Sequence, residues 1–262
     1  MLRTYCPGSP RGTVIATWGG MQSFVGEKMT QEELNARAAE HQLWRTRVAG
    51  SGRFELRERA VRGVSFRGRA LVDSLWSSVL VVEADLTGTH LDHGQLKGVS
   101  FRSCRLAGTS FLDCVMNDVD FREAQMPRAD LSELFDARRV LMQGANLRHG
   151  ILRKSLVTDS NFDAADLENA NLSKAEFQDC SFRNANLRGA DLGETEFVNV
   201  DLRGADLTGA RLLKTTFRRV RVHGLRGLPT EDTGIFAEEI DIRAEGEAHF
   251  DQPASTLRTL LR

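Results

Sequence analysis

The sequence predicts an all-β solenoid with four sides, in which the chain winds in coils of about twenty residues. Three observations predict this fold. Every fifth residue from Leu147 to Val222 is Leu, Phe or Val, at sixteen consecutive positions. The residue two places before each of them is always Ala, Gly, Ser, Thr, Cys or Val. Residues twenty apart also agree in type, and the series that begins at Leu147 contains only leucine.

A period of five is incompatible with the two common elements. Five residues turn an α-helix by about 140° net, so apolar residues at this period would be scattered around a helix. A continuous β-strand is also excluded. Its side chains alternate between two faces, so a repeat of five residues would place the apolar residue on the opposite face in each successive repeat. The two apolar positions are instead separated by two residues and then by three. Each pentad is therefore a very short strand followed by a corner, with the small and the large apolar side chains both pointing inward.

The repeats also identify a resemblance. Residues 185–189 (Ala-Asn-Leu-Arg-Gly) and 190–194 (Ala-Asp-Leu-Gly-Glu) resemble the A-(D/N)-L-x-x consensus of the pentapeptide-repeat family. The resemblance covers residues 84–222 well and residues 54–81 more loosely. It implies a right-handed quadrilateral β-helix. It implies little about function, because one fold carries many functions.

The N-terminal part of the chain precedes the repeats. Residues 1–29 form an irregular extension that is rich in Gly and Pro. A capping box then predicts a helix from Thr30 to about Arg47, in which Thr30 accepts at the N-cap and Glu33 reaches back to it. We expect this capping helix and its linker, residues 30–53, to cover the open end of the first coil.

The first repeat segment covers residues 54–131, with weak pentads before Leu86 and regular ones after it. Leu131 and Leu147 are sixteen residues apart, one more than three pentads, so residues 132–146 interrupt the register. Either a bulge absorbs the extra residue or a loop protrudes. An interruption of a regular scaffold is where partner binding disturbs the fold least. The candidate partner-binding residues at the tip of such a loop are Leu134, Phe135, Arg138 and Arg139.

The second repeat segment covers residues 147–226, and residues 227–262 form an acidic tail with a short C-terminal helix. We expect the acidic tail to fold back on the basic last coil. The helix is expected to cap that coil through an apolar stripe of Leu257, Leu260 and Leu261. In topoisomerase-protecting members of the family a C-terminal helix forms the dimer interface. This segment resembles it in position and polarity, which implies a homodimer through the C-terminal segment.

The composition indicates a soluble, cytoplasmic protein. The chain has 35 Lys and Arg residues against 36 Asp and Glu residues, and this balance argues against direct binding to nucleic acid. No apolar run is long enough to cross a membrane, and the N-terminus lacks a convincing signal peptide. Cys104, Cys114 and Cys180 fall on the small inward position, where we expect buried thiols rather than a disulfide or a metal site.

The sequence contains no recognisable catalytic motif. It has no phosphate-binding glycine loop, no zinc-protease helix and no nucleophile elbow. His90 and His93 lie on different sides of a corner and lack a third ligand nearby. Outward carboxylates such as Glu194 and Glu196 are expected on a convex surface without a cleft. We therefore expect no enzyme activity, no cofactor and no metal.

Charge is unevenly distributed along the chain. Between Thr158 and Ala210, eleven acidic residues stand against four basic ones. These acids could form one acidic, partner-binding face of the rod. The candidate residues for that face are Asp159, Asp166, Glu168, Asp191, Glu194, Glu196 and Asp206.

Three functional hypotheses follow. The first is a non-enzymatic scaffold that binds a protein partner, which the fold and the absent chemistry both favour. The second is implied by the family resemblance: an acidic rod mimics DNA, binds DNA gyrase or topoisomerase IV, and confers resistance to gyrase inhibitors. The third is a secreted effector or an export-linked accessory protein, with the irregular N-terminus as its address.

Overall fold

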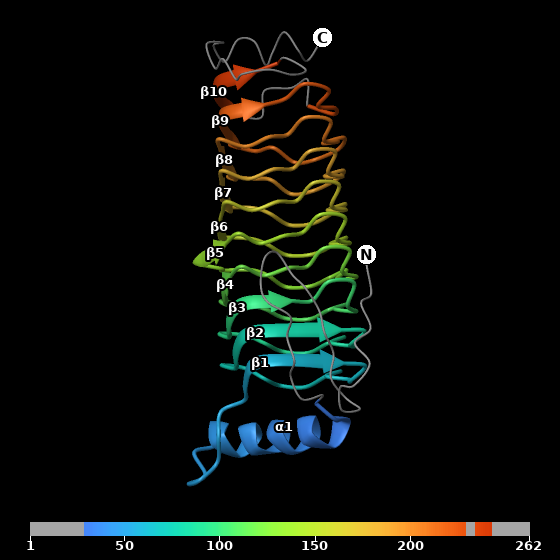
Figure 1. The fold of residues 1–262 in the computed structure, drawn as a ribbon. Coiled ribbons are helices and arrows are strands. Elements are labelled where there is room, and N and C mark those ends of the chain that lie inside the picture. The colour runs from blue at the N-terminus through green and yellow to red at the C-terminus, as the bar shows by residue number, and fades with distance from the viewer. Residues whose placement is uncertain (1–28, 229–233, 243–262) are drawn as a thin grey trace, which may run out of the picture.

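The computed structural model describes residues 29–228 and 234–242, and it forms a four-sided parallel β-solenoid with one helix at its N-terminal end (Figure 1). The predicted fold class is thus confirmed. Ten strands form one parallel sheet in the order β1 to β10 along one side of the rod. The elements are α1 (Gln31–Arg45), β1 (Glu55–Arg62), β2 (Leu75–Val82), β3 (Gln95–Ser100), β4 (Val115–Asn117), β5 (Asp136–Arg138), β6 (Leu156–Thr158), β7 (Glu176–Gln178), β8 (Glu196–Val198), β9 (Thr216–Arg221) and β10 (Phe236–Asp241).

The coils stack in the predicted twenty-residue register. On the side that carries the strands, Phe177 pairs with Phe197 and Phe197 with Phe217. Single bridges join the coils on the other sides, as between Asp166 and Asn186. We call the strand side the first face. The second, third and fourth faces follow in chain order, and in one coil they are residues 181–183, 186–188 and 191–193.

The interior of the rod is filled by the two predicted apolar columns. The large inward residues from Leu147 to Val222 are each at most 5% exposed. Threonines at the small inward position donate their hydroxyl to a carbonyl of the preceding coil, as Thr195 Oγ1 does to Leu172 O at 2.8 Å and Thr109 Oγ1 to Leu86 O at 2.7 Å. Each buried hydroxyl therefore has a partner, and its burial costs the fold little.

The corners between the faces use left-handed backbone. They recur every five residues and form columns along the rod. In one column Ala164, Asn184, Gly204 and Gly224 have φ values of 55°, 57°, 71° and 70°. Only glycine adopts this conformation without steric cost, so the stacked ladder must hold the other corner residues in place.

Helix α1 begins as predicted, with Thr30 Oγ1 accepting the Glu33 N–H at 3.1 Å. The second half of the capping box differs from the prediction. The Glu33 carboxylate pairs with Arg37 and Arg59 rather than reaching back to Thr30. Two arginines are stronger partners for a carboxylate than one backbone N–H, because those hydrogen bonds are charge-assisted on both sides.

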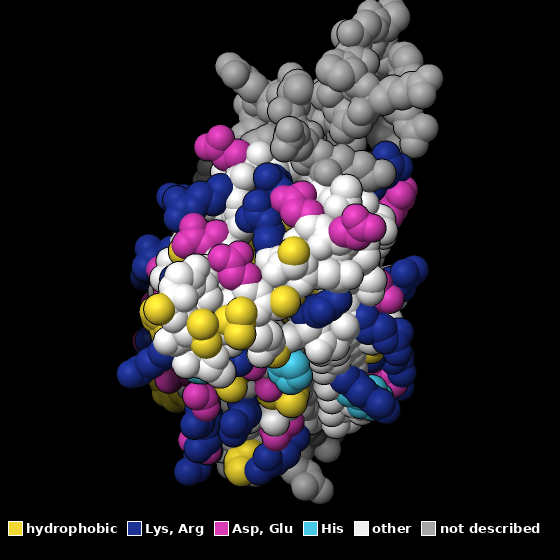
Figure 2. Space-filling model, turned by 90° about the horizontal axis from the view of Figure 1, so that it is seen from below, with side chains coloured by type: hydrophobic (Ala, Val, Ile, Leu, Met, Phe, Trp, Pro, Cys, Tyr) yellow, Lys and Arg dark blue, Asp and Glu magenta, His cyan; other side chains and the backbone are white. Residues whose placement is uncertain are grey.

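Helix α1 covers the open edge of the first coil, as predicted. The molecule seen from this end carries a mixture of acidic, basic and apolar side chains (Figure 2). The Gln31 amide accepts the Ser65 N–H at 2.8 Å and donates to Ser65 O at 3.0 Å. Gln42 Nε2 donates to Ala70 O at 3.0 Å. These side-chain amides therefore replace the peptide groups that a further coil would supply.

The interruption predicted at residues 132–146 is a bulge of one residue. Paired residues are twenty apart before it, as in Gln95 with Val115, and twenty-one apart across it, as in Val115 with Asp136. The spacing returns to twenty from Ala137 with Val157 onward. The structure thus decides between the two alternatives, because no loop protrudes from this part of the described chain.

The bulge changes which residues fill the core. Leu134 is only 2% exposed and takes the small inward position, Phe135 is turned out to solvent, and Ala137 takes the large inward position. The usual sizes are therefore exchanged within the bulge. The large Leu134 occupies the inward position that normally holds a small residue, and the small Ala137 occupies the one that normally holds a large residue. The five-residue repeat then resumes at Met142 and Leu147.

Two serines of the next coil satisfy the backbone around the bulge. Ser155 Oγ accepts the Leu134 N–H at 3.1 Å and donates to Leu131 O at 2.8 Å. Ser160 Oγ accepts the Val140 N–H at 2.9 Å and donates to Thr158 O. The bulge therefore leaves these buried backbone groups paired.

The described C-terminal part extends the solenoid further than the sequence indicated. Strand β10, which the sequence assigned to the tail, pairs with β9 and places Ala237 beside Phe217. An alanine at the large inward position hid this repeat. Ion pairs Arg218–Glu238 (3.1 Å) and Arg219–Glu239 (2.8 Å) join the acidic tail to the basic coil, as expected. The C-terminal stripe of Leu257, Leu260 and Leu261 lies outside the described residues, as do residues 1–28.

Candidate functional site

The bulge presents an aromatic side chain to solvent near the middle of the rod. Phe135 is 62% exposed and is the most exposed large hydrophobic residue of the described chain. It precedes β5, where Asp136 stands in register with Val115 of β4. Val115 and Leu156, the outward residues of the neighbouring strands at this level, are both half-buried. By register, Phe135 therefore adjoins a small apolar patch of Val115 and Leu156, with Asp136 between these two residues.

Charged residues hold fixed positions at the edge of this patch. Arg138 Nε lies 2.6 Å from Asp136 Oδ1. Arg139, at a left-handed corner, forms two hydrogen bonds to the Asp118 carboxylate at 2.6 and 2.9 Å. These hydrogen bonds hold the pKa of Asp118 below its usual value. We call Phe135, Arg138 and Arg139 the bulge surface. Leu134, the fourth residue predicted for this site, is buried and cannot contact a partner.

The seven acidic candidates do not share one face. Glu196 lies on the first face and Asp191 on the fourth, while Asp159 and Glu194 occupy left-handed corners. Three of them belong to the third face. Asn186 lies on that face, and both Asp166 and Asp206 form bridges with it. These third-face residues are Asp166, Glu168 and Asp206.

Most of these acids are also paired with a base of a neighbouring coil. Arg148 Nη1 contacts both Asp166, at 3.3 Å, and Glu168. Three further pairs join residues about one coil apart: Arg211–Asp191 at 3.1 Å, Arg188–Asp206 at 3.2 Å and Lys174–Glu194 at 3.7 Å. The predicted continuous acidic face is therefore absent from the described surface, because the acids are spread over several faces and neutralised locally.

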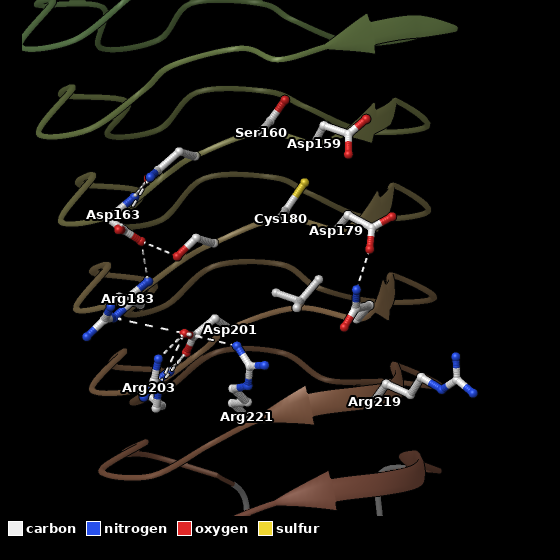
Figure 3. A pocket seen from close by; sticks show the side chains of 14 residues that line it. Asp159, Ser160, Asp163, Asp179, Cys180, Arg183, Asp201, Arg203, Arg219 and Arg221 are labelled. Atoms are coloured by element: carbon white, nitrogen blue, oxygen red, sulfur yellow. Dashed lines mark hydrogen bonds and ion pairs between the residues drawn. The ribbon is translucent and has the colours of Figure 1, made fainter. Parts of the chain in front are cut away.

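A shallow groove of about 590 Å³ crosses the second face and its corner (Figure 3). Asp201 lies among three arginines there. Arg203 Nη2 is 2.6 Å from its Oδ2, and the guanidinium groups of Arg183 and Arg221 lie at 3.9 and 4.0 Å. Burial alone would raise the pKa of Asp201, but the hydrogen bonds and charge of Arg203 outweigh burial, so the pKa lies below its usual value.

The groove has opposite charges at its two ends. Asp159, Asp163 and Asp179 lie toward the N-terminal coils, and the arginines lie toward the C-terminal coils (Figure 3). Of these residues, only Asp159 was among the site residues predicted from the sequence. Listing residues at intervals of twenty would have found it, because Asp163, Arg183 and Arg203 form one column. With four aspartates and four arginines, the groove carries no net charge.

The buried thiols carry no reactive chemistry. Burial raises the pKa of Cys104 to about 11 and that of Cys180 to about 12. Cys114 is shifted in the same direction, and its Sγ donates to Leu91 O at 3.0 Å. Since the thiolate is the nucleophile and the metal ligand, all three stay inert near neutral pH. They are free thiols, as expected.

His90 and His93 contact different carboxylates. His93 Nδ1 lies 3.1 Å from Asp113 and His90 Nδ1 lies 3.6 Å from Asp92, so each ring has its own carboxylate. Across residues 29–228 and 234–242, no group of three or more His, Cys, Asp or Glu side chains could hold a metal ion. None of the described helices is long and apolar enough to cross a bilayer.

Two family descriptions match the chain. "Pentapeptide repeat region" matches residues 138–207 and 155–226, and "Pentapeptide repeats (8 copies)" matches residues 82–111 and 95–133. Together these matches cover more than half of the 262 residues. Among curated proteins, no significant match is found.

Solved structures of pentapeptide-repeat proteins resemble the chain at low identity. Full-length QnrB1, a plasmid-mediated fluoroquinolone resistance protein, is 12% identical with a TM-score of 0.38, covering 79% of this chain and 98% of its own. HetL, involved in heterocyst differentiation regulation in the cyanobacterium Nostoc sp. strain PCC 7120, is 18% identical with a TM-score of 0.32, covering 84% of this chain and 100% of its own. Similarity at this level says nothing about what the chain binds.

Proposed function

We propose that this chain, which belongs to the pentapeptide-repeat family, is a protein-binding scaffold that holds its partner at the bulge surface. The observation that supports this proposal is the 62% exposure of Phe135 in a rod whose other phenylalanines between residues 54 and 217 are buried. The same residue marks the single change of register between β1 and β9. The stacking of the coils does not require an exposed aromatic residue at this irregular coil, so Phe135 is available for a partner.

The surroundings of Phe135 have the composition of a protein-binding site. Such sites combine an aromatic anchor with arginine and a polar rim that excludes water. Val115 and Leu156 extend the apolar area, and Arg138 and Arg139 lie beside it in fixed positions. Because the ladder holds the backbone of the bulge in place, binding would require ordering of only a few side chains.

Topoisomerase protection by DNA mimicry is the alternative raised by the family resemblance. A DNA mimic needs a continuous acidic surface that replaces the phosphate backbone. Here five of the seven acidic candidates pair with Arg or Lys, and the seven are spread over several faces. The described surface therefore favours a partner that is recognised through the bulge surface.

The third hypothesis, a secreted effector or export-linked protein, relied on the N-terminal extension. That segment lies outside the described residues. The scaffold proposal does not depend on it.

The test compares partner binding by the wild type, Phe135→Ala and Leu213→Ala. Leu213 is 42% exposed at a distant coil and provides a matched control. Burying a phenylalanine contributes about 2 kcal/mol, so Phe135→Ala should weaken the Kd for a co-purified partner roughly 30-fold in calorimetry. Leu213→Ala should leave the Kd unchanged, and both variants should melt like the wild type.

Equal affinity of Phe135→Ala and the wild type would refute the bulge surface as the binding site. A supercoiling assay with gyrase and a quinolone addresses the alternative separately. Protection at stoichiometric protein that survives Phe135→Ala would favour topoisomerase protection through another surface.

A further inference from the structure

We propose that helix α1 is a pH-sensitive latch, held over the first coil by the neutral form of His41 and released when His41 is protonated. This inference concerns the N-terminal end of the rod and is independent of the function proposed for the bulge surface. Figure 1 shows α1 lying across the end of the solenoid beside β1.

His41 is the polar member of the buried side of α1, together with Leu34 and Ala38. Its side chain is 0% exposed. The imidazole stacks on Trp44, with ring centroids 5.5 Å apart and an interplanar angle of 16°, and it meets the edge of Phe54 at 6.3 Å. A titratable ring is thus enclosed by aromatic surfaces at the junction of helix and solenoid.

The neutral ring forms the hydrogen bond that joins α1 to the start of the solenoid. The Phe54 N–H donates to His41 Nδ1 at 3.0 Å, and the Phe54 carbonyl accepts the Leu75 N–H at 3.0 Å. One residue therefore connects the helix below it with the coil above it. Nδ1 can accept only when it carries no proton, so the imidazolium cannot make this bond.

Protonation of the ring would be compensated only in part, by the Val72 carbonyl and Asp73. The proton of the neutral ring resides on Nε2, which is buried and has no hydrogen-bond partner. A second proton, on Nδ1, would point at the Phe54 N–H, and two donors would face each other inside the junction. A buried charge is costly when its partners do not offset the loss of hydration, so the charged ring moves to water, and α1 moves with it.

The groups that face His41 act in both directions, and burial dominates. Burial lowers the pKa of His41, and Arg45 of α1 and Arg53 of the linker add to this effect. The Val72 carbonyl and Asp73, from the corner before β2, act in the opposite direction. The net result is a pKa below the usual value for histidine.

The sign of the pH dependence follows from this shift. When α1 is released, His41 has the ordinary histidine pKa of about 6.5, whereas in the closed state its pKa is lower. The latch is therefore fully closed above about pH 6.5. As the pH falls below this value, the open state binds more protons, and the opening constant rises up to about tenfold per pH unit until the closed-state pKa is reached.

Release of α1 would uncover the edge of the first coil. The backbone of Ser65 and the carbonyls of Glu55 and Ala70 would lose their partners from Gln31, Arg37 and Gln42. Acid would thus convert a closed end of the rod into an unpaired strand edge, which is the feature that solenoid caps normally hide.

The test is amide hydrogen exchange followed by NMR between pH 7.5 and 5.0, corrected for the intrinsic rate at each pH. The amides of Phe54 and Ser65 report on the latch, because both donate to side chains of α1. Leu187, whose N–H bonds to Asp206 O in the middle of the solenoid, is the internal reference. Below about pH 6.5, protection of the two reporters should fall up to about tenfold per unit, while that of Leu187 stays constant.

Two variants and one titration make the outcome decisive. His41→Asn keeps an acceptor in place of Nδ1 but does not titrate, so its reporters should be independent of pH. His149→Asn, at an exposed corner with φ 57°, should behave like the wild type. The same pH slope in His41→Asn, or no slope in the wild type, would overturn the proposal.

If His41→Asn is already open at pH 7.5, the NMR titration of His41 in the wild type decides. A pKa below that of ordinary histidine supports the latch. A pKa at or above that value refutes it.

Discussion

The two ends of the solenoid are packed with aromatic rings, whereas its middle is not. Toward the N-terminus, rings from Phe54 to Phe121 are in contact, and Phe101 and Phe121 stack at 5.4 Å. Toward the C-terminus, rings from Phe162 to Phe217 do the same. Between them the large inward positions hold Met126, Leu131, Ala137, Met142, Leu147, Leu152 and Val157.

This difference explains where the rod tolerates an extra residue. Phe162 and Phe182 stack at 4.6 Å with an interplanar angle of 2°, and such contact requires strict register between coils. Methionine and small aliphatic side chains adapt to irregular gaps at little cost. The bulge at Phe135 lies within this aliphatic segment. The register between coils is therefore strictest where aromatic rings stack. The bulge with the exposed Phe135 lies in the aliphatic segment, where the register is less constrained.

The largest expected effect is a loss of stability from the aromatic column. Phe182→Ala should lower the free energy of unfolding by roughly 3–5 kcal/mol, because it removes a fully buried ring from a stack and leaves a cavity. Met142→Leu, in the aliphatic segment, should cost less than about 1.5 kcal/mol. Urea unfolding at equilibrium measures both. Equal costs would remove the distinction between the two regions.

The next effect tests the compensation inside the bulge. Leu134→Ala should cost roughly 2–5 kcal/mol, since Leu134 is buried. Combining it with Ala137→Leu restores the order of small and large inward residues. The double variant should therefore be more stable than the sum of the single changes predicts, by about 0.5–3 kcal/mol. Simple additivity would show that the two positions do not share one space.

The smallest effect concerns the serines that pair with the bulge. Ser155→Ala should cost about 1–3 kcal/mol, because it leaves the buried Leu134 N–H and the Leu131 carbonyl without their partner. Ser173→Ala provides the control, since the Ser173 hydroxyl bonds only to the neighbouring Asn171 side chain at the surface. Hydrogen exchange at Leu134 measures the local opening. Unchanged protection in Ser155→Ala would mean that water replaces the hydroxyl.

The sequence predicted the solenoid because its period reports directly which side chains point inward. It located an extra residue between Leu131 and Leu147 by counting alone. It could not decide which residue is expelled, because Leu134 and Phe135 are both apolar. Ala137 and Ala237 break the rule that the second inward residue is large, and this hid one repeat in the interruption and strand β10 in the tail.

The prediction of one continuous acidic face was wrong for a different physical reason. A count of charges along the chain ignores that neighbours in space are about one coil apart in sequence, so Asp191 pairs with Arg211 and Asp206 pairs with Arg188. Intervals of 18 to 21 residues, applied to outward residues, recover most of the ion pairs. The role of His41 was beyond this reasoning, because it depends on which ring nitrogen faces the Phe54 N–H.

The left-handed corners have a consequence for protein engineering. Ala164, Asn184 and Gly204 adopt similar φ values in one column, so corner geometry is set by the coil and hardly by the residue that occupies it. Successive corners are about 4.8 Å apart along the axis, the spacing of hydrogen-bonded strands. Dyes or cross-linkers attached at chosen corners would be held at multiples of this spacing. The corners thus provide attachment points at a known and regular spacing along the rod.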